Sequence, residues 1–149
     1  MATDRIEKSI VLRAPRARVW RAISNPEEFG SWFRVKLDAA AFAPGARVKG
    51  RLTIAGYEAW PFEIVVERVE PERLLSYRWH PYPEPGLDLA REPMTLVEFR
   101  LEEVTGGTEL TVVESGFDAI PLERRATVFR MNEGGWTEQL KNVERHVAS

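Results

Sequence analysis

The pattern of apolar and polar positions along the chain changes period twice. Residues 5–13 alternate loosely between apolar and polar side chains, which predicts a first β-strand. From residue 32 to residue 113 the dominant period is two, as expected for strands that each bury one face. The last stretch, 121–148, has a helical period instead, because its apolar residues are spaced by threes, fours and sevens: Leu122, Phe129, Trp136, Leu140, Val143 and Val147. We therefore expect one long amphipathic helix to close the chain.

Two short helices are predicted between the first strand and the alternating region. Pro15 suits the first turn of a helix that reaches Ser24. A second helix start follows at once, with Asn25 as N-cap, a proline at the first position and Glu28 at the third, which is the spacing of a capping box. Gly30 is expected to end this second helix after little more than one turn.

The alternating region predicts five or six further strands joined by turns. Glycine-containing turn signals separate several of them, and the proline-rich segment 81–86 must be a loop. The expected strands are 32–38, 47–54, 60–69, 74–79, 94–103 and 108–116. With the first strand, this predicts an α+β fold in which a curved antiparallel sheet of about six or seven strands wraps on the long C-terminal helix. The space between such a sheet and one helix is a usual site for a small ligand.

A glycine pair interrupts the predicted C-terminal helix. Gly134 and Gly135 lie in its middle, where each glycine costs about 1 kcal/mol relative to alanine. Such a pair just before Trp136 indicates close backbone approach to a neighbouring element, or a bend that lets the helix follow the curved sheet. A weak position that the fold tolerates is the simpler alternative. Of these interpretations, we favour tight packing at this point.

Composition limits the class of protein. The chain has 149 residues, of which 44% are hydrophobic and 30% are charged, so we expect a single domain over residues 1–149. A net charge of −2 gives no electrostatic reason to expect nucleic acid as a partner. No apolar run is long enough to span a membrane, residues 1–5 lack the apolar stretch of a signal peptide, and no cysteine occurs. We therefore expect a cytoplasmic protein without disulfides or thiolate chemistry.

Several short motifs recur in the same order in one known group of proteins. They are Ala14-Pro15 followed by Val19-Trp20, Trp32-Phe33, Gly50, Glu70-Pro71 with Arg73-Leu74, Gly107-Thr108-Glu109-Leu110, Ser115-Gly116-Phe117 and Gly135-Trp136. On these motifs, the sequence resembles the START-like helix-grip (SRPBCC) superfamily over nearly its whole length, in the branch of the activator of the heat-shock-protein-90 ATPase. The resemblance implies a curved antiparallel sheet that grips a C-terminal helix, with a cavity between them.

What the resemblance implies about function is broader. Members of the superfamily include lipid carriers, plant hormone receptors, aromatase/cyclases of polyketide synthesis and chaperone activators, so the fold is shared and the chemistry is not. Chaperone activators of the well-known kind carry an additional amino-terminal domain, for which 149 residues leave no room. A chaperone partner is therefore the weaker expectation.

The sequence contains no familiar catalytic signature. Its two histidines are His80, at the edge of the proline-rich loop, and His146, which we place on the surface near the end of the last helix. His80 could contact a ligand or shuttle a proton, although a solvated position is the simpler interpretation. No metalloprotease, hydrolase or phosphate-binding motif occurs, so the sequence predicts no metal site, no cofactor and no catalytic residue.

One carboxylate and a set of aromatic residues are the candidates for ligand binding. Glu114 continues the alternation of Leu110 and Val112, which directs it under the final helix as the partner of a buried cation or as a polar anchor of the cavity. If the strand frays near Gly116, Glu114 turns outward instead. The large rings either fill the core or line the cavity. The candidate ligand-binding residues are Trp32, Trp60, Tyr77, Trp79, Phe99, Glu114, Phe129 and Trp136.

These observations predict a protein that binds an apolar, aromatic or lipid-like small molecule between the sheet and the C-terminal helix, without covalent chemistry. The proline-rich loop after His80 would be a lid over the cavity. One alternative is an enzyme similar to polyketide cyclases or hydratases, with Glu114 or His80 as acid or base. Another is a chaperone-associated module that binds a protein through the outer face of the sheet. Exposed edge strands are compatible with a homodimer.

Overall fold

The computed structural model describes residues 4–148. In chain order the elements are β1 (Arg5–Leu12), α1 (Arg16–Ser24), α2 (Pro26–Phe33), β2 (Val35–Leu37), β3 (Arg47–Leu52), β4 (Pro61–Glu70), β5 (Leu74–Trp79), η1 (Leu89–Arg91), β6 (Thr95–Val104), β7 (Gly107–Ser115), η2 (Phe117–Ala119) and α3 (Leu122–Ala148). Residues 1–3, which contribute to the argument against a signal peptide, lie outside the described residues, as does residue 149 of the expected domain. Within residues 4–148, no helix is both long enough and apolar enough to cross a membrane.

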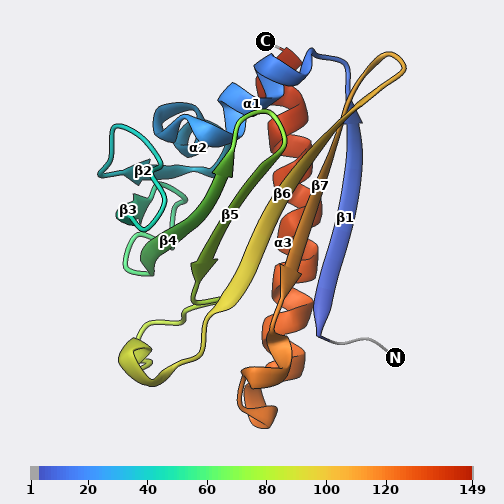
Figure 1. Cartoon of the computed structure of the whole chain (residues 1–149). Coiled ribbons are helices and arrows are strands. Elements are labelled where there is room, and N and C mark those ends of the chain that lie inside the picture. Colours follow the sequence, from blue (N-terminus) through green and yellow to red (C-terminus); the bar gives the residue numbers. More distant parts are fainter. Residues whose placement is uncertain (1–3, 149) are drawn as a thin grey trace.

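The strands form one seven-stranded antiparallel sheet, and α3 lies along one face of it (Figure 1). The strand order is β1-β7-β6-β5-β4-β3-β2, so neighbours in the chain pair side by side except for β1, which pairs with β7. α1 and α2 lie at the end of the sheet where α3 reaches the C-terminus (Figure 1). This arrangement confirms the predicted α+β fold, a curved antiparallel sheet that grips the C-terminal helix.

The second short helix is longer than the sequence predicts. The expectation that Gly30 ends it is wrong, because α2 continues to Phe33 and ends at Arg34, which adopts a left-handed φ of 70°. The expected strand from residue 32 is therefore wrong at its start, and β2 covers only Val35–Leu37. Gly30 serves close packing instead, because a Cβ at this position would lie 2.2 Å from the backbone oxygen of Val35.

The apolar face of α3 is only partly as the sequence predicts. Its buried residues are Val128, Trp136, Leu140 and Val143. Leu122 is 75% exposed, and Phe129 is only partly buried, with its ring centroid 5.1 Å from that of Phe117 in η2. The helical spacing is right, but Leu122 faces solvent and Phe129 packs on η2, while the neighbouring Val128 takes the buried position. Spacing alone does not reveal how much of the sheet lies opposite each helical turn.

The glycine pair in α3 does not mark a close approach. Among the described residues, none places an atom within 4 Å of a Cβ built on Gly134 or on Gly135. The expectation of tight packing is therefore wrong at both positions. The reason is that both glycines lie on exposed parts of the helix surface, while Trp136, which follows them, carries the packing.

A charged cluster joins the three helices. The Glu28 carboxylate in α2 accepts hydrogen bonds from Arg18 Nη1 and Arg21 Nε of α1, both 2.7 Å long, and lies 2.9 Å from Nε2 of His146 in α3. His146 is thus part of a helix–helix contact, which corrects its expected placement on the surface. Desolvation raises the pKa of Glu28, but the hydrogen bonds from His146 and Arg18 and the arginine charges outweigh it and hold this pKa below its ordinary value.

Candidate functional site

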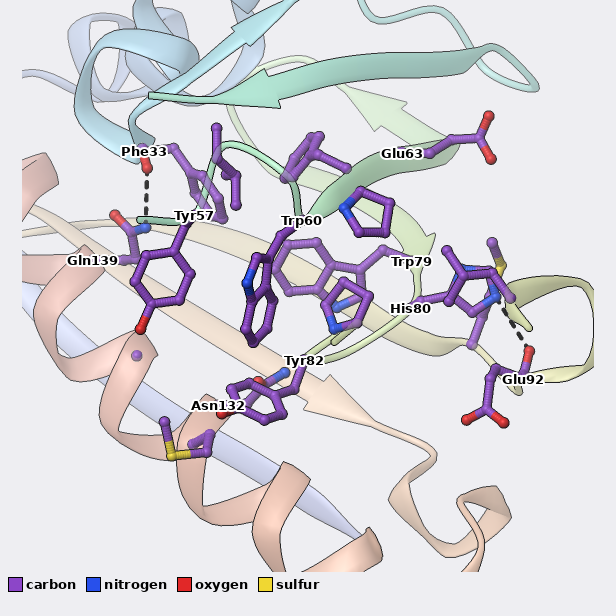
Figure 2. A pocket seen from close by; sticks show the side chains of 18 of the residues that line it. Phe33, Tyr57, Trp60, Glu63, Trp79, His80, Tyr82, Glu92, Asn132 and Gln139 are labelled. Carbon is purple, nitrogen blue, oxygen red and sulfur yellow. Dashed lines mark hydrogen bonds between the residues drawn. The ribbon is translucent and has the colours of Figure 1, made fainter. Parts of the chain in front are cut away.

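A pocket of about 610 Å³ lies between α3 and the strands β3, β4 and β5 (Figure 2). The segment between β3 and β4 and the segment between β5 and β6 contribute further walls. The space expected between the sheet and the final helix is thus present. Seven aromatic residues line it: Phe33, Tyr57, Trp60, Phe62, Trp79, Tyr82 and Trp136.

Three aromatic rings on loop segments form one wall of the pocket. Trp60, directly before β4, lies between Tyr57 and Tyr82, and its ring centroid is 5.1 Å from that of each (Figure 2). Tyr82 belongs to the proline-rich loop and has a left-handed φ of 46°. The prolines on both sides of Tyr82 restrict the backbone there. The loop conformation therefore places the Tyr82 ring against Trp60.

A second wall consists of two tryptophans, one from the sheet and one from the helix. Trp79 is the last residue of β5, and Trp136 lies on the buried face of α3. Their rings stack, with centroids 5.7 Å apart and an interplanar angle of 28°. The indole Nε1 of each donates a 2.8 Å hydrogen bond to Glu114, Trp79 to Oε2 and Trp136 to Oε1. One carboxylate therefore fixes both rings.

Glu114, near the end of β7, is fully buried and faces α3, as the alternation of its strand predicts. Besides the two indoles, Thr95 Oγ1 donates to its Oε2 at 2.5 Å and Asn132 Nδ2 donates to its Oε1 at 3.0 Å. All four partners are neutral, and within residues 4–148 no ion pair involves this carboxylate. Glu114 is thus a polar anchor behind the pocket and does not pair with a buried cation.

The predicted candidates do not include several residues that line the pocket: Phe33, Tyr57, Phe62, Tyr82, Asn132 and Gln139. Asn132 is the one among them that contacts Glu114. It lies one helical turn before Trp136 on the same face of α3, lines the pocket, and donates to both oxygens of Glu114, at 3.0 and 3.2 Å. The available signal was its position, four residues after the apolar Val128 and four before Trp136. An amide on the buried face of a helix needs a hydrogen-bond partner, which points to a polar site.

The structure divides the predicted candidates into two groups. Trp60, Trp79 and Trp136 line the pocket, and Glu114 lies directly behind the last two. The other candidates lie elsewhere in the described fold, three in the core and the last against η2: Trp32, Tyr77, Phe99 and Phe129.

Tyr77 places a polar group, its hydroxyl, in the apolar core. It is fully buried, and its hydroxyl has no hydrogen-bond partner among the described residues. Burial raises the pKa of Tyr77 well above its ordinary value, and the nearby charge of Glu114 raises it further. The phenol is therefore held in its neutral form.

The charged residues that line the pocket are engaged with other side chains or with the backbone. Arg47 and Glu63 form an ion pair of 3.7 Å, and Glu92 pairs with Arg124. His80 Nε2 lies 3.2 Å from the backbone oxygen of Glu92 (Figure 2), so the tautomer with hydrogen on Nε2 donates there. No group of three or more histidine, cysteine or acidic side chains within the described part of the chain could hold a metal ion.

A curved antiparallel sheet that encloses a pocket against one long C-terminal helix defines the class of helix-grip proteins. Within this class, the chain belongs to the family described as Activator of Hsp90 ATPase homolog 1-like protein, whose model matches residues 13–148. This confirms the resemblance to the SRPBCC superfamily and to the branch named from the sequence motifs. No curated protein matches the chain.

Solved structures share the fold over nearly the whole chain. Protein MLL2253 from Mesorhizobium loti is 26% identical with a TM-score of 0.77, and the match covers 97% of this chain and 96% of that one. DynU16, described as a protein in the dynemicin biosynthetic locus, is 25% identical with a TM-score of 0.74, and the match covers 98% of this chain. The chain spans only 48% of the length of DynU16. A protein from Arthrobacter aurescens, at 14% identity, 98% and 87% coverage and a TM-score of 0.79, shows the shared fold alone.

Proposed function

We propose that this protein binds an apolar, aromatic small molecule in the pocket between β3–β5 and α3. The observation that carries the proposal is the set of seven aromatic residues around a space of about 610 Å³. A mostly apolar, concave space of this size suits a ligand of drug-like size. Ring faces and edges favour a ligand that itself contains a ring, because offset and edge-to-face contacts add to the burial of apolar surface.

A few polar groups of the pocket would orient the ligand. The Gln139 side-chain nitrogen donates to the backbone oxygen of Phe33 at 3.3 Å (Figure 2), and its oxygen accepts from Asn142 Nδ2 at 3.0 Å, which leaves one lone pair of this oxygen for a ligand. The amide nitrogen of Asn132 is engaged by Glu114, so the carbonyl oxygen of Asn132 is likewise an acceptor. A ligand with one hydroxyl or N–H group on a ring system would match these acceptors.

We assign the proline-rich loop the role of a lid. Tyr82 and Pro83 of this loop line the pocket. The loop lies between β5 and β6, outside the hydrogen-bonded ladder of the sheet, so its displacement breaks no strand pairing. Loops of this kind can open for a ligand at low cost, since the sheet behind them stays intact.

The same geometry favours binding without covalent chemistry. Glu114, the buried carboxylate, has both oxygens occupied by protein donors and lies behind the rings rather than at the pocket surface. A group in this position holds Trp79 and Trp136 in place, and a ligand could reach it only if these rings moved. Its role is therefore positioning.

Native mass spectrometry on freshly purified protein, compared with the denatured mass, tests the proposal. A co-purifying mass between roughly 200 and 600 Da, in the range that such a pocket can enclose, is the expected result. Trp60→Leu should reduce the bound fraction, because it removes the central ring of the loop wall. Trp20→Leu removes a tryptophan of α1 away from the pocket and should leave the bound fraction unchanged. Equal loss in both variants would contradict the proposed site.

A cyclase-type enzyme is the second candidate, favoured by the similarity to DynU16 from a biosynthetic locus and by His80 at the pocket wall. His80 is one titratable group of the pocket wall that could serve a substrate as acid or base. In that case, an added aromatic polyketide-like compound would be recovered with a changed mass. His80→Gln would abolish the change and preserve binding. Recovery of the unchanged compound would favour the binding function.

The chaperone-associated alternative takes its support from the description of the family. It would place the partner on the outer face of the sheet, where Lys49 of β3 is exposed. Under that alternative, Lys49→Glu would weaken binding to a purified chaperone and Trp60→Leu would not. If the pocket is the functional site, small-molecule binding should instead be weakened by Trp60→Leu and not by Lys49→Glu.

A further inference from the structure

We propose that the ligand of this pocket carries a positive charge beside its aromatic part, so that the protein prefers an organic cation to a neutral or anionic compound of the same shape. A quaternary ammonium group attached to a ring is the simplest member of this class. The inference rests on the proposed function, because it names the class of ligand that the same pocket takes. It follows from the unbalanced charge of Glu114 and from the rings between this charge and the pocket.

The first step is the balance of charge around the pocket. Within residues 4–148, the partners of Glu114 are two indoles, a hydroxyl and an amide, and none of them carries a charge. These groups donate hydrogen bonds, which suits the ionised carboxylate, because that form only accepts. The carboxylates at the pocket wall differ in this respect, since Glu63 and Glu92 each pair with an arginine. Glu114 therefore leaves one negative charge without a counter-ion beside the pocket.

The second step concerns the surroundings of this charge. Glu114 is fully buried, and so are most of the side chains around it. In such surroundings the electric field of a charge reaches further than it does in water, because little solvent screens it. A cation in the pocket would balance the charge of Glu114, whereas an anion there would be repelled.

The third step is the route by which the charge acts on a ligand. Trp79 and Trp136 each line the pocket, and each donates its N–H to Glu114 at 2.8 Å. Donation to an anion polarises the indole and makes its ring face more negative. The face of an indole is already the most favourable aromatic surface for a cation. Because the two rings stack, each covers one face of the other, and a cation in the pocket would contact the remaining surface of the pair.

The loop rings complete an enclosure suited to a methylated ammonium group. The loop wall of Tyr57, Trp60 and Tyr82 adds three more rings, with neighbouring centroids 5.1 Å apart (Figure 2). Several ring faces around one space are the arrangement by which proteins hold quaternary ammonium groups. Such a group is weakly hydrated and needs no hydrogen-bond acceptor, so the scarcity of free polar groups here does not oppose its binding.

Three compounds of one shape and different charge provide the test. They are (3-hydroxyphenyl)trimethylammonium, its neutral isostere 3-tert-butylphenol, and 3-hydroxybenzenesulfonate, each titrated into the wild-type protein under ligand-observed NMR with the phenols protonated. We expect the cation to bind at least about tenfold more tightly than the neutral compound, and the sulfonate to bind most weakly. Equal or tighter binding of the neutral compound or the sulfonate overturns this inference and leaves the proposed function standing. Binding of none of the three contradicts the proposed function itself.

A charge variant tests the assigned cause. In Glu114→Gln the ratio of the cation affinity to the neutral affinity should fall to about threefold or less. Glu109→Gln is the matched control, because it removes the same charge from the same strand on the other face, and its ratio should equal that of the wild type. If the folded Glu114→Gln variant keeps the same ratio of cation affinity to neutral affinity as the wild type, the inference is overturned. If circular dichroism shows that this variant does not fold, the wild-type comparison still decides, since it needs no variant.

Discussion

Trp136 and Glu114 hold each other across the contact between helix and sheet. The indole Nε1 of Trp136 donates a 2.8 Å hydrogen bond to Oε1 of Glu114, and the two residues are only 3% and 0% exposed. Trp79 occupies the other oxygen, so a single carboxylate on β7 is tied to both α3 and β5. The shape of the pocket and its electric field therefore depend on the same residue, and changes at Glu114 should affect both.

Replacement of Glu114 by glutamine should lower the free energy of unfolding by about 1–3 kcal/mol. The new amide nitrogen would face N–H donors, which leaves at least one of the indoles without an acceptor. Urea unfolding followed by tryptophan fluorescence measures the change. Glu109→Gln, on the same strand but only partly buried, should change stability by less than about 0.5 kcal/mol. A Glu114→Gln protein as stable as the wild type would contradict the role of this carboxylate as an anchor.

The fold could be predicted from the sequence because its signals are local. Asn25 accepts a 3.0 Å hydrogen bond from the backbone of Glu28, as the expected N-cap requires. The alternation along β7 correctly directs Glu114 inward, since successive strand residues point to opposite faces. Trp136, Leu140 and Val143 are buried as their helical spacing predicts. Each of these features depends on residues close together in the chain.

The composition of the pocket could not be predicted in the same way, because it depends on segments far apart in the chain. Trp60 and Tyr82 meet through two loops, whose conformations no alternation or helical period describes. Phe129 has the correct helical spacing but lies opposite η2, whose position the sequence does not indicate. Asn132 donates to a carboxylate 18 residues away on another element. Its partner becomes visible only when both elements are placed in space.

Tyr77 should make the protein less stable at alkaline pH. Burial raises the pKa of Tyr77, so above about pH 10, the value in an unfolded chain, the folded state keeps a proton that the unfolded state loses. Stability should therefore be unaffected by this group below about pH 10 and fall above it, by up to about 1.4 kcal/mol per pH unit. Urea unfolding of the wild type and of Tyr77→Phe at neutral and alkaline pH measures the difference.

The same variant has a second expected property near neutral pH. Tyr77→Phe removes a buried hydroxyl that has no partner among the described residues, so its stability should equal or exceed that of the wild type. A loss of more than about 1 kcal/mol would show that the hydroxyl is hydrogen-bonded in solution. If the free energy of unfolding falls with alkaline pH equally in the wild type and in Tyr77→Phe, burial does not hold Tyr77 in its neutral form.

Glu28 should contribute stability that acid removes. Its pKa in the fold is below the ordinary value of 4.5, so its full contribution is present above about pH 4.5. As the pH falls further, the unfolded chain takes up the proton first. The stabilising contribution of Glu28 is then lost progressively, until the pH is below the pKa of Glu28 in the folded state. Glu28→Gln should lower stability near neutral pH by about 1 kcal/mol and differ less from the wild type in acid. Glu27→Gln, at an exposed neighbouring position, should show no such difference.

The glycine pair in α3 offers a matched test of helix stability and pocket shape. A methyl group at Gly134 or Gly135 would meet none of the described atoms within 4 Å, and alanine is favoured over glycine in a helix by about 1 kcal/mol. Each alanine variant should therefore raise the free energy of unfolding by roughly 0.5–1 kcal/mol, measured by urea unfolding.

The two alanine variants should differ in ligand binding, because Gly135 lines the pocket and Gly134 does not line it in the described structure. Gly135→Ala should weaken the binding of the largest ligands, while Gly134→Ala should bind like the wild type. Equal binding by both variants would show that the ligand does not reach this side of the pocket, and destabilisation by either would show that the helix surface is covered in solution.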